Sequence, residues 1–406
     1  MIAGTKVPEL RLLPIFAKLL EPLTPDAFFR RYWEQDIFVQ TSSRPDRFAG
    51  LVSLDDVDAL VCDPMLRYPD IRLARHGADA MAPEDYLTGG GRLDPVAVAK
   101  LFFAGATIVC DRAHLRIAAL GDLCRDLGGE LGVEFQTNLY LSPPSAQGFP
   151  LHYDTHDVFV LQVIGSKKWS IFDSPFRLPL GGQPHESDDL GPGEQSMEFE
   201  LNAGDMAYLP RGYYHQAQTS SEMSLHITLG AMNKTWSDFV IEAVAEACGR
   251  DAELRSALPV GMLNHKADPT QMRAAFAKVW QKLSGAVDFG VIDELFQADF
   301  RANQSVAPKQ ILASAAKSIS LHPQCRVQMR PSVVVTQSGA GQIILNLESR
   351  TIKLPTRLSA AIASLSGAGG VIAVELHGMP DWDSRLLLCR RLIEEGFAIV
   401  LTDHAD

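Results

Sequence analysis

A His-x-Asp pair, followed by a distant histidine in a glycine- and proline-rich segment, constrains this chain most. The first part reads Gly148-Phe-Pro-Leu-His152-Tyr-Asp154, and the second reads Gly204-Asp-Met-Ala-Tyr-Leu-Pro210-Arg-Gly212-Tyr-Tyr-His215. Because side chains alternate between the two faces of an extended strand, His152 and Asp154 are expected to point the same way. Two imidazoles and one carboxylate on one face of a metal leave further positions open, which is typical of non-haem Fe(II) oxygenases rather than closed structural zinc sites. We therefore predict that His152, Asp154 and His215 bind iron.

The residues after the pair leave a second ligand set open. The segments Leu161-Gln-Val-Ile-Gly165 and Trp169-Ser-Ile-Phe-Asp173 predict a strand, a turn and a second strand, with the ligands at one end. If the strand that carries the pair is regular, His156 lies on the same face as His152. The spacing alone therefore also allows His152, His156 and His215 as ligands, with Asp154 outside the ligand set.

Three segments of the chain resemble one known family. They are Asn138-Leu-Tyr-Leu-Ser-Pro-Pro-Ser-Ala-Gln-Gly148-Phe-Pro-Leu-His152-Tyr-Asp154, Gly165-Ser-Lys167-Lys-Trp169, and the segment from Gly204 to His215, whose Gly-x5-Pro-x-Gly-x2-His spacing is the second cupin motif. Together they closely resemble the JmjC ribosomal oxygenases, a branch of the cupin superfamily. The resemblance implies an α+β fold: a double-stranded β-helix (cupin/JmjC jelly roll) with a helical N-terminal shoulder, a helical dimerisation region and a C-terminal winged-helix domain.

The resemblance also implies where a cosubstrate binds. Asn138 lies where the family has a polar residue that contacts 2-oxoglutarate, and Lys167 lies where it has the lysine that pairs with the distal carboxylate. A dicarboxylate in a mostly apolar pocket needs such a cation, because a buried carboxylate without a partner is costly. One position departs from the family, which has a strand reading roughly His-Leu-Thr-Leu-Ser, whereas this chain reads His226-Ile-Thr228-Leu-Gly230. Gly230 offers no hydroxyl, so Thr228 or a water is expected to replace it.

The function that the resemblance implies is that of an Fe(II)- and 2-oxoglutarate-dependent dioxygenase. It would use O2 to hydroxylate a histidine or arginine side chain of a protein such as a ribosomal protein. Tyr213 and Tyr214, with Asp157 near the other rim, could flank such a planar side chain or be ordinary barrel packing. Two other functions stay open: a tailoring oxygenase of a ribosomally made precursor peptide, and a non-catalytic cupin module that binds a metal or a peptide.

The composition indicates a globular chain, and the net charge favours a basic partner. With 406 residues, of which 46% are hydrophobic, two or three domains with real cores are expected. A net charge of -12 without a lysine or arginine run disfavours a nucleic-acid scaffold and favours encounter with a basic protein or peptide. The six cysteines show no Cys-x-x-Cys spacing, which argues against a zinc ribbon and a secreted disulfide frame, and so predicts a cytoplasmic protein. The first residues lack the pattern of a signal peptide or a membrane span, so no membrane association is expected.

The apolar pattern, taken together with the resemblance, divides the chain into four parts. We expect an N-terminal helical part over 1–114, the JmjC/cupin core over 115–236, a helical dimerisation region over 237–320 and a winged-helix-like domain over 321–406. Thr24 is expected to cap a helix that begins at Pro25, and Thr270 to cap another. The apolar helix faces within 237–320 predict a homodimer, although packing within the chain would explain them equally well.

The last predicted helix runs from Trp382 to Glu395 and ends at Gly396. Its arginines are offset by acidic neighbours, so it lacks the character of a basic recognition helix. We therefore expect no direct DNA binding.

Overall fold

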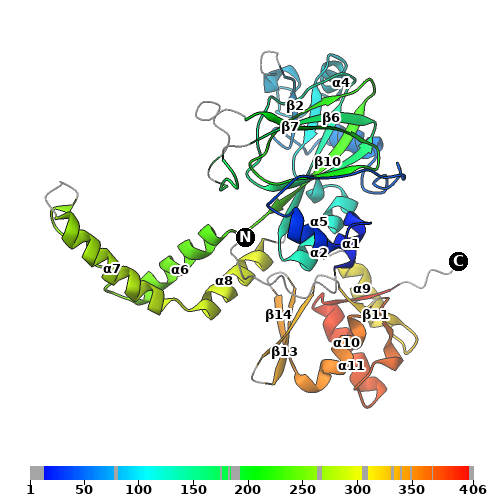
Figure 1. Ribbon diagram of the computed structural model, residues 1–406. Coiled ribbons are helices and arrows are strands. Elements are labelled where there is room, and N and C mark those ends of the chain that lie inside the picture. Colours follow the sequence, from blue (N-terminus) through cyan, green and yellow to red (C-terminus); the bar gives the residue numbers. More distant parts are fainter. Residues whose placement is uncertain are drawn as a thin grey trace. The chain divides into compact units, whose positions relative to one another are not determined.

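A computed structural model gives the fold of the chain (Figure 1). It describes residues 13–76, 81–173, 176–181, 183, 193–262, 268–303, 310–330, 333–338, 341–347, 350–367 and 369–401. The chain divides into two compact units, one made of residues 1–232 and 304–406 and the other of residues 233–303. In the described ranges, no helix is both long enough and apolar enough to cross a membrane.

The N-terminal part is mainly helical. Helix α2 (Pro25–Arg31) begins where the sequence predicts, because the Thr24 hydroxyl accepts a hydrogen bond from the Ala27 amide and proline occupies the first turn. Ser53 and Asp56 form a reciprocal capping box at the start of α3 (Leu54–Cys62). The other helical elements of this part are α1 (Pro14–Leu20), η1 (Pro83–Asp85), α4 (Pro95–Phe103), η2 (Ala113–Leu115) and α5 (Ala118–Leu131).

Strands between residues 38 and 232 form two antiparallel sheets. The larger has the order β1-β8-β5-β10-β4-β3-β2 and the smaller β7-β6-β9. Neighbouring strands are therefore often distant in sequence, as in a jelly roll and unlike a simple meander. The strands are β1 (Phe38–Gln40), β2 (Ile71–Ala74), β3 (Thr107–Cys110), β4 (Glu134–Ser142), β5 (Asp157–Ile164), β6 (Ser166–Phe172), β7 (Gln195–Asn202), β8 (Met206–Leu209), β9 (Tyr214–Thr219) and β10 (Ser224–Met232).

The larger sheet is covered on both faces. One face packs with the N-terminal helices in a core that includes Phe16, Phe28 and Phe159. The other face meets the smaller sheet through Val158, Val160, Trp169 and Ile171, so the two faces of β5 are both buried. The alternation predicted for residues 169–173 is present, because Trp169 and Ile171 point inward from β6. The expected cupin/JmjC fold with mixed α and β structure is therefore confirmed.

The unit of residues 233–303 is helical, with α6 (Trp236–Arg250), α7 (Pro269–Ala286) and α8 (Phe289–Ala302). The prediction that Thr270 caps a helix is wrong, because Asp268 is the cap and its carboxylate accepts a hydrogen bond from the Thr270 amide. Proline suits the first helical position, so α7 begins one residue before Thr270. Large apolar side chains of this unit are exposed, among them Trp236, Ile241, Phe276, Trp280 and Phe289.

The C-terminal region packs its own core around two three-stranded sheets, β15-β11-β16 and β12-β13-β14. Helix α11 (Trp382–Glu394) ends one residue earlier than predicted, and Gly396 follows with a φ of 83°. The winged-helix assignment stays a prediction. The remaining elements are α9 (Ile311–Ile319), β11 (Arg326–Met329), β12 (Val334–Ser338), β13 (Gln342–Leu347), β14 (Arg350–Pro355), η4 (Thr356–Leu358), α10 (Ser359–Leu365), β15 (Val371–Ile372), η5 (Ala373–Glu375) and β16 (Ala398–Val400).

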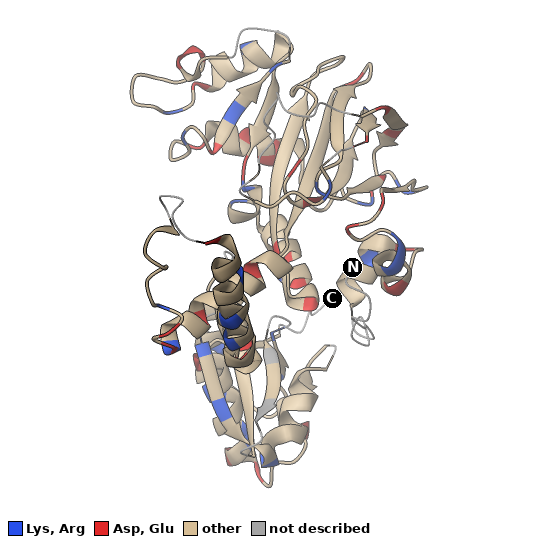
Figure 2. Cartoon of the chain, turned by 60° about the vertical axis from the view of Figure 1, so that its left-hand side comes forward, with Lys and Arg blue, Asp and Glu red and all other residues tan. Residues whose placement is uncertain are grey.

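Two arginines of α11 serve the fold of this region. Arg385 donates to the carbonyl oxygens of Val374 and Met379, and Arg390 donates to that of Ser318. Acidic and basic positions are interspersed over the chain instead of being separated into blocks (Figure 2). The expectation of no direct DNA binding stays a prediction.

Candidate metal centre and its pocket

The structure brings His152, Asp154 and His215 together. One ligand atom from each lies within 4.8 Å of the others, and they are the one such group among the described histidines, cysteines and carboxylates. The expectation that the His-x-Asp pair lies on a regular strand is wrong. His152 forms an isolated bridge with His215, the residues after it bend, and β5 begins only at Asp157.

Backbone contacts hold the three residues in place. The amide of His152 donates to the carbonyl of His215 at 3.2 Å, and the reverse bond is 2.7 Å long. The Gly212 amide donates to the carbonyl of Asp154 at 2.9 Å. Gly212 has a φ of 90°, and a β-carbon there would lie 2.8 Å from the Phe176 carbonyl oxygen, so this turn of the motif requires glycine.

The outward nitrogens of both histidines face backbone acceptors. Nδ1 of His152 lies 2.8 Å from the Pro150 carbonyl oxygen, and Nδ1 of His215 lies 3.0 Å from that of Tyr213. A carbonyl oxygen only accepts hydrogen bonds, so each ring carries its proton on Nδ1 and leaves the Nε2 lone pair free. Nε2 of His215 lies 3.7 Å from Oδ2 of Asp154. This orientation of the free lone pairs is the one that histidine ligands of metals adopt.

Burial keeps His215 neutral. Burial, and to a lesser extent the neighbouring His152, lowers the pKa of His215 to about 4. A neutral imidazole can donate its lone pair to a cation, and the Asp154 carboxylate supplies the negative charge. The residues present therefore fit a divalent metal with two nitrogen ligands and one oxygen ligand.

A cavity of about 290 Å³ adjoins these three side chains. Its wall includes Lys167 from β6, whose ammonium donates to the Ser142 hydroxyl at 3.0 Å and lies 3.4 Å from Nδ1 of His226. Lys167 is only 4% exposed, and burial lowers its pKa to about 7. In the described part of the chain no carboxylate pairs with this ammonium. The cavity therefore combines a candidate metal centre with a buried cation that lacks an anionic partner.

The other two predicted cosubstrate residues also line the cavity, although both already have partners. The side-chain oxygen of Asn138 accepts a hydrogen bond from the Arg112 amide at 2.9 Å. The Thr228 hydroxyl is hydrogen-bonded to that of Tyr140, whose pKa burial raises to about 12. The Thr228 hydroxyl, which was expected to replace the hydroxyl that Gly230 lacks, is thus already hydrogen-bonded to another side chain.

Sequence reasoning missed several residues of the cavity wall. Tyr140 and His226 stack on each other with ring centroids 4.8 Å apart, and Arg72 enters from β2. Burial, together with nearby Lys167, lowers the pKa of His226 well below its usual range. The alternation on β4 and β10 could have revealed Tyr140 and His226, because they lie two residues from Asn138 and Thr228. Arg72 left no such signal, because its strand precedes the motif by many residues.

The remaining candidates lie apart from the metal centre. His156 lines the cavity but is outside the three-residue group, which argues against the alternative ligand set. Asp157 is fully buried and accepts a hydrogen bond from the Arg211 amide at 2.9 Å. Tyr213 and Tyr214 are also outside the cavity wall, since Tyr214 packs edge-on against Tyr153. None of these three residues lines this cavity, and the hypothesis that they flank a substrate stays a prediction.

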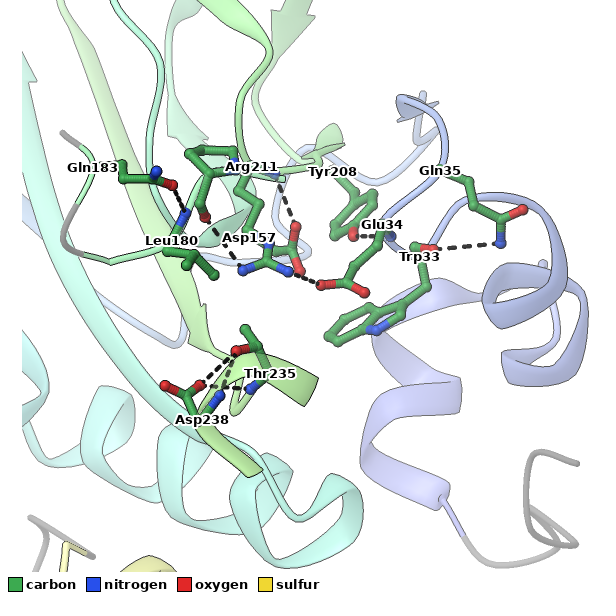
Figure 3. A network of polar contacts seen from close by, with 11 residues as sticks. Trp33, Glu34, Gln35, Asp157, Leu180, Gln183, Tyr208, Arg211, Thr235 and Asp238 are labelled. Carbon is green, nitrogen blue, oxygen red and sulfur yellow. Dashed lines mark hydrogen bonds and ion pairs between the residues drawn. The ribbon is translucent and has the colours of Figure 1, made fainter. Parts of the chain in front are cut away.

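A polar network joins the barrel to the N-terminal part (Figure 3). Arg211, which is 8% exposed, pairs with Glu34 at 2.7 Å and donates to the Pro179 carbonyl. The Glu34 amide donates to the Tyr208 hydroxyl at 2.9 Å, and Trp33 stacks on the Tyr208 ring. Arg211 lies in the turn between Pro210 and Gly212, so this network fixes the segment that leads into His215.

Residues 122–239 match the family model described as JmjC domain. Over 338 residues the chain is 32% identical to Ribosomal oxygenase 1 of Rattus norvegicus, which covers 77% of this chain and 54% of that protein. It is 30% identical over 263 residues to the bifunctional lysine-specific demethylase and histidyl-hydroxylase NO66 of Drosophila grimshawi, covering 62% of this chain and 36% of that protein. The chain thus spans about half, or less, of the length of these relatives.

Solved structures with a similar fold include two of one bacterial protein. YcfD, a ribosomal oxygenase from Escherichia coli in complex with cobalt and 2-oxoglutarate, superposes with a TM-score of 0.54 over 94% of this chain and 99% of that chain, at 15% identity. The same protein with cobalt and succinic acid gives a TM-score of 0.55 at 16% identity. Residues 122–239 thus match a JmjC domain, and the fold of the chain agrees with that match. Among proteins with that domain the chain is similar to the ribosomal oxygenases, and the resemblance read from the sequence is confirmed.

Proposed function

We propose that this chain is an Fe(II)- and 2-oxoglutarate-dependent oxygenase that hydroxylates a protein side chain. One observation carries the proposal: the cavity lined by His152, Asp154 and His215 is also lined by the buried ammonium of Lys167, which no carboxylate of the described residues pairs with. A metal centre alone would be compatible with many chemistries. A metal centre together with a buried cation fits a ligand that chelates the metal at one end and carries a carboxylate at the other.

Each residue has a separate task in this proposal. His152, Asp154 and His215 hold Fe(II), while the Pro150 and Tyr213 carbonyls orient the two imidazoles. Lys167 binds the distal carboxylate of 2-oxoglutarate, with Ser142 and His226 fixing the position of the ammonium. Asn138 and Thr228 shape the wall between them. When bound, the metal and the cosubstrate supply the oxidation of a C–H bond by O2, and the protein positions the reactants and excludes water.

The proposed substrate is a histidine or arginine side chain of a basic protein, such as a ribosomal protein. The relatives named as ribosomal oxygenases and as a histidyl-hydroxylase support this, as does the net charge of -12, which attracts a basic partner over long range. The test is comparative mass spectrometry of ribosomal proteins and small peptides from cells with and without the enzyme. We expect a gain of one oxygen on a histidine or arginine. If every oxidised species that depends on the enzyme is a free metabolite, the proposal is contradicted.

Two simpler measurements separate the alternatives. Succinate formation from 2-oxoglutarate in the presence of substrate distinguishes an oxygenase from a non-catalytic binding module. A modified precursor peptide in place of a ribosomal protein in the mass spectra would favour the tailoring oxygenase. We further propose a homodimer through the exposed apolar side chains of α6, α7 and α8, and a reducing cytoplasm as the compartment, because the six cysteines are all free thiols.

A further inference from the structure

Gly230 and His156 compete for the same space in the wall of the cavity. A β-carbon built at position 230 would lie 2.6 Å from Cδ2 and 2.8 Å from Nε2 of His156. Non-bonded carbon atoms attract one another only near 3.5–4.0 Å, so a side chain at position 230 would displace the imidazole. The two positions therefore form a matched pair, in which a small residue at one permits a large residue at the other.

The glycine is present for space and not for its backbone freedom. Gly230 lies inside strand β10, in register with Val158 on one side and Gln136 on the other. Its φ is not among the positive values of the described chain, so any L-residue could adopt this conformation. Glycine within a strand often marks a place where another group approaches closely. Here that group is the ring of His156.

The ring of His156 is also available to a ligand. It is partly buried, it lines the cavity together with His215, and it is close enough to lower the pKa of His215. Across the described residues, no hydrogen bond or ion pair involves its nitrogens. The Thr228 hydroxyl, the other group near position 230, is hydrogen-bonded to Tyr140.

The arrangement of the wall indicates which ligand meets this ring. His226, Thr228 and Gly230 alternate along one face of β10, with Lys167 beside His226 at one end and His156 against Gly230 at the other. The cavity of about 290 Å³ is near the lower limit of small-molecule pockets, so a small dicarboxylate held by Lys167 would lie within reach of most of its wall.

We propose that His156 is a cosubstrate-positioning residue. Its imidazole occupies the space that Gly230 leaves open and from there donates a hydrogen bond to a carboxylate oxygen of 2-oxoglutarate. The inference rests on the proposed function, because it assumes that 2-oxoglutarate occupies the cavity. It assigns to the pair the contact that a hydroxyl at position 230 would otherwise make. A hydrogen-bond donor at position 156 or at position 230 is sufficient for this contact. The space does not permit the imidazole of His156 together with a side chain at position 230.

The test is the affinity of the full chain for 2-oxoglutarate, measured by calorimetry with Mn(II) bound so that no turnover occurs. His156→Ala should weaken binding about tenfold, the loss expected for one hydrogen bond to a charged group. Gly230→Ser should also weaken it, because the new side chain displaces the ring. The double variant His156→Ala/Gly230→Ser should recover to within about threefold of the wild type, because a hydroxyl then has room to donate. His156→Gln, which keeps a donor, should retain most of the affinity.

Controls separate this inference from the proposed function. Thr155→Ala changes the same loop at a residue outside the cavity wall and should bind normally. Mn(II) affinity and the thermal midpoint should stay the same in His156→Ala, which excludes misfolding. Unchanged 2-oxoglutarate affinity in His156→Ala, or a double variant as weak as His156→Ala, would overturn the inference alone. A wild-type chain that binds Mn(II) but no 2-oxoglutarate would overturn the proposed function.

Discussion

Replacing Lys167 with methionine should stabilise the free protein and weaken its binding of 2-oxoglutarate. Lys167 is 4% exposed, and burial lowers its pKa from 10.5 to about 7. The unfolded chain binds this proton more tightly than the folded chain does, so the penalty on folding is fully present below pH 7. It is lost as the pH rises toward the unfolded value of 10.5. A shift of this size corresponds to roughly 5 kcal/mol at neutral pH, an upper estimate because methionine also loses the bond to Ser142.

The same replacement should reduce ligand affinity. Losing a hydrogen bond to a charged group in a pocket costs roughly 1.5 to 3 kcal/mol, so 2-oxoglutarate should bind roughly 10- to 100-fold more weakly. In the wild type, binding requires the protonated ammonium. The affinity should therefore fall about tenfold for each pH unit above about 7, with uptake of up to about one proton.

Two measurements on the Mn(II)-loaded protein test these expected changes in affinity and stability. Calorimetry in buffers of different ionisation enthalpy gives the affinity and the proton uptake, and urea unfolding at pH 7 gives the stability. The matched control is Lys168→Met, since Lys168 is exposed and pairs with the exposed Glu198, so it should change neither quantity appreciably. A destabilised Lys167→Met protein with unchanged affinity would refute the assignment of Lys167 as the carboxylate anchor.

Three further results are expected. Replacing any one of His152, Asp154 or His215 with alanine should abolish stoichiometric Mn(II) binding in a metal titration, whereas His156→Ala should retain it; a His215→Ala protein that still binds would disprove the ligand set. Glu34→Ala should lower the free energy of unfolding by about 1 to 3 kcal/mol in urea, because it leaves the buried Arg211 guanidinium without its carboxylate, and an unchanged midpoint would contradict the role of that ion pair. The intact chain should be a dimer by light scattering, and Phe276→Lys/Trp280→Lys should make it monomeric; a wild-type monomer at about 50 µM would refute the proposed interface.

The sequence by itself determined the elements whose causes are local. The Thr24 cap acts within one turn of its helix, and the alternation of Trp169 and Ile171 follows from the geometry of a single strand. The motif around Gly204, Pro210 and Gly212 was equally legible, because a positive φ or a close backbone approach restricts the residue type directly. Asp268 was missed as a cap because Asp268 and Thr270, two residues apart, could both play that role.

Only the tertiary structure decided which side chains share the cavity. His152 and Asp154 were expected to face the same way on a regular strand, yet they converge through a single bridge to His215 and a bend, both set by pairing between distant segments. Gly230 looked like the loss of a donor until His156, far away in sequence, was found to fill its space. Spacing along a chain fixes which face of one strand a residue occupies. What lies opposite that face depends on the packing of the two sheets, because contacts across a core are not encoded by local periodicity.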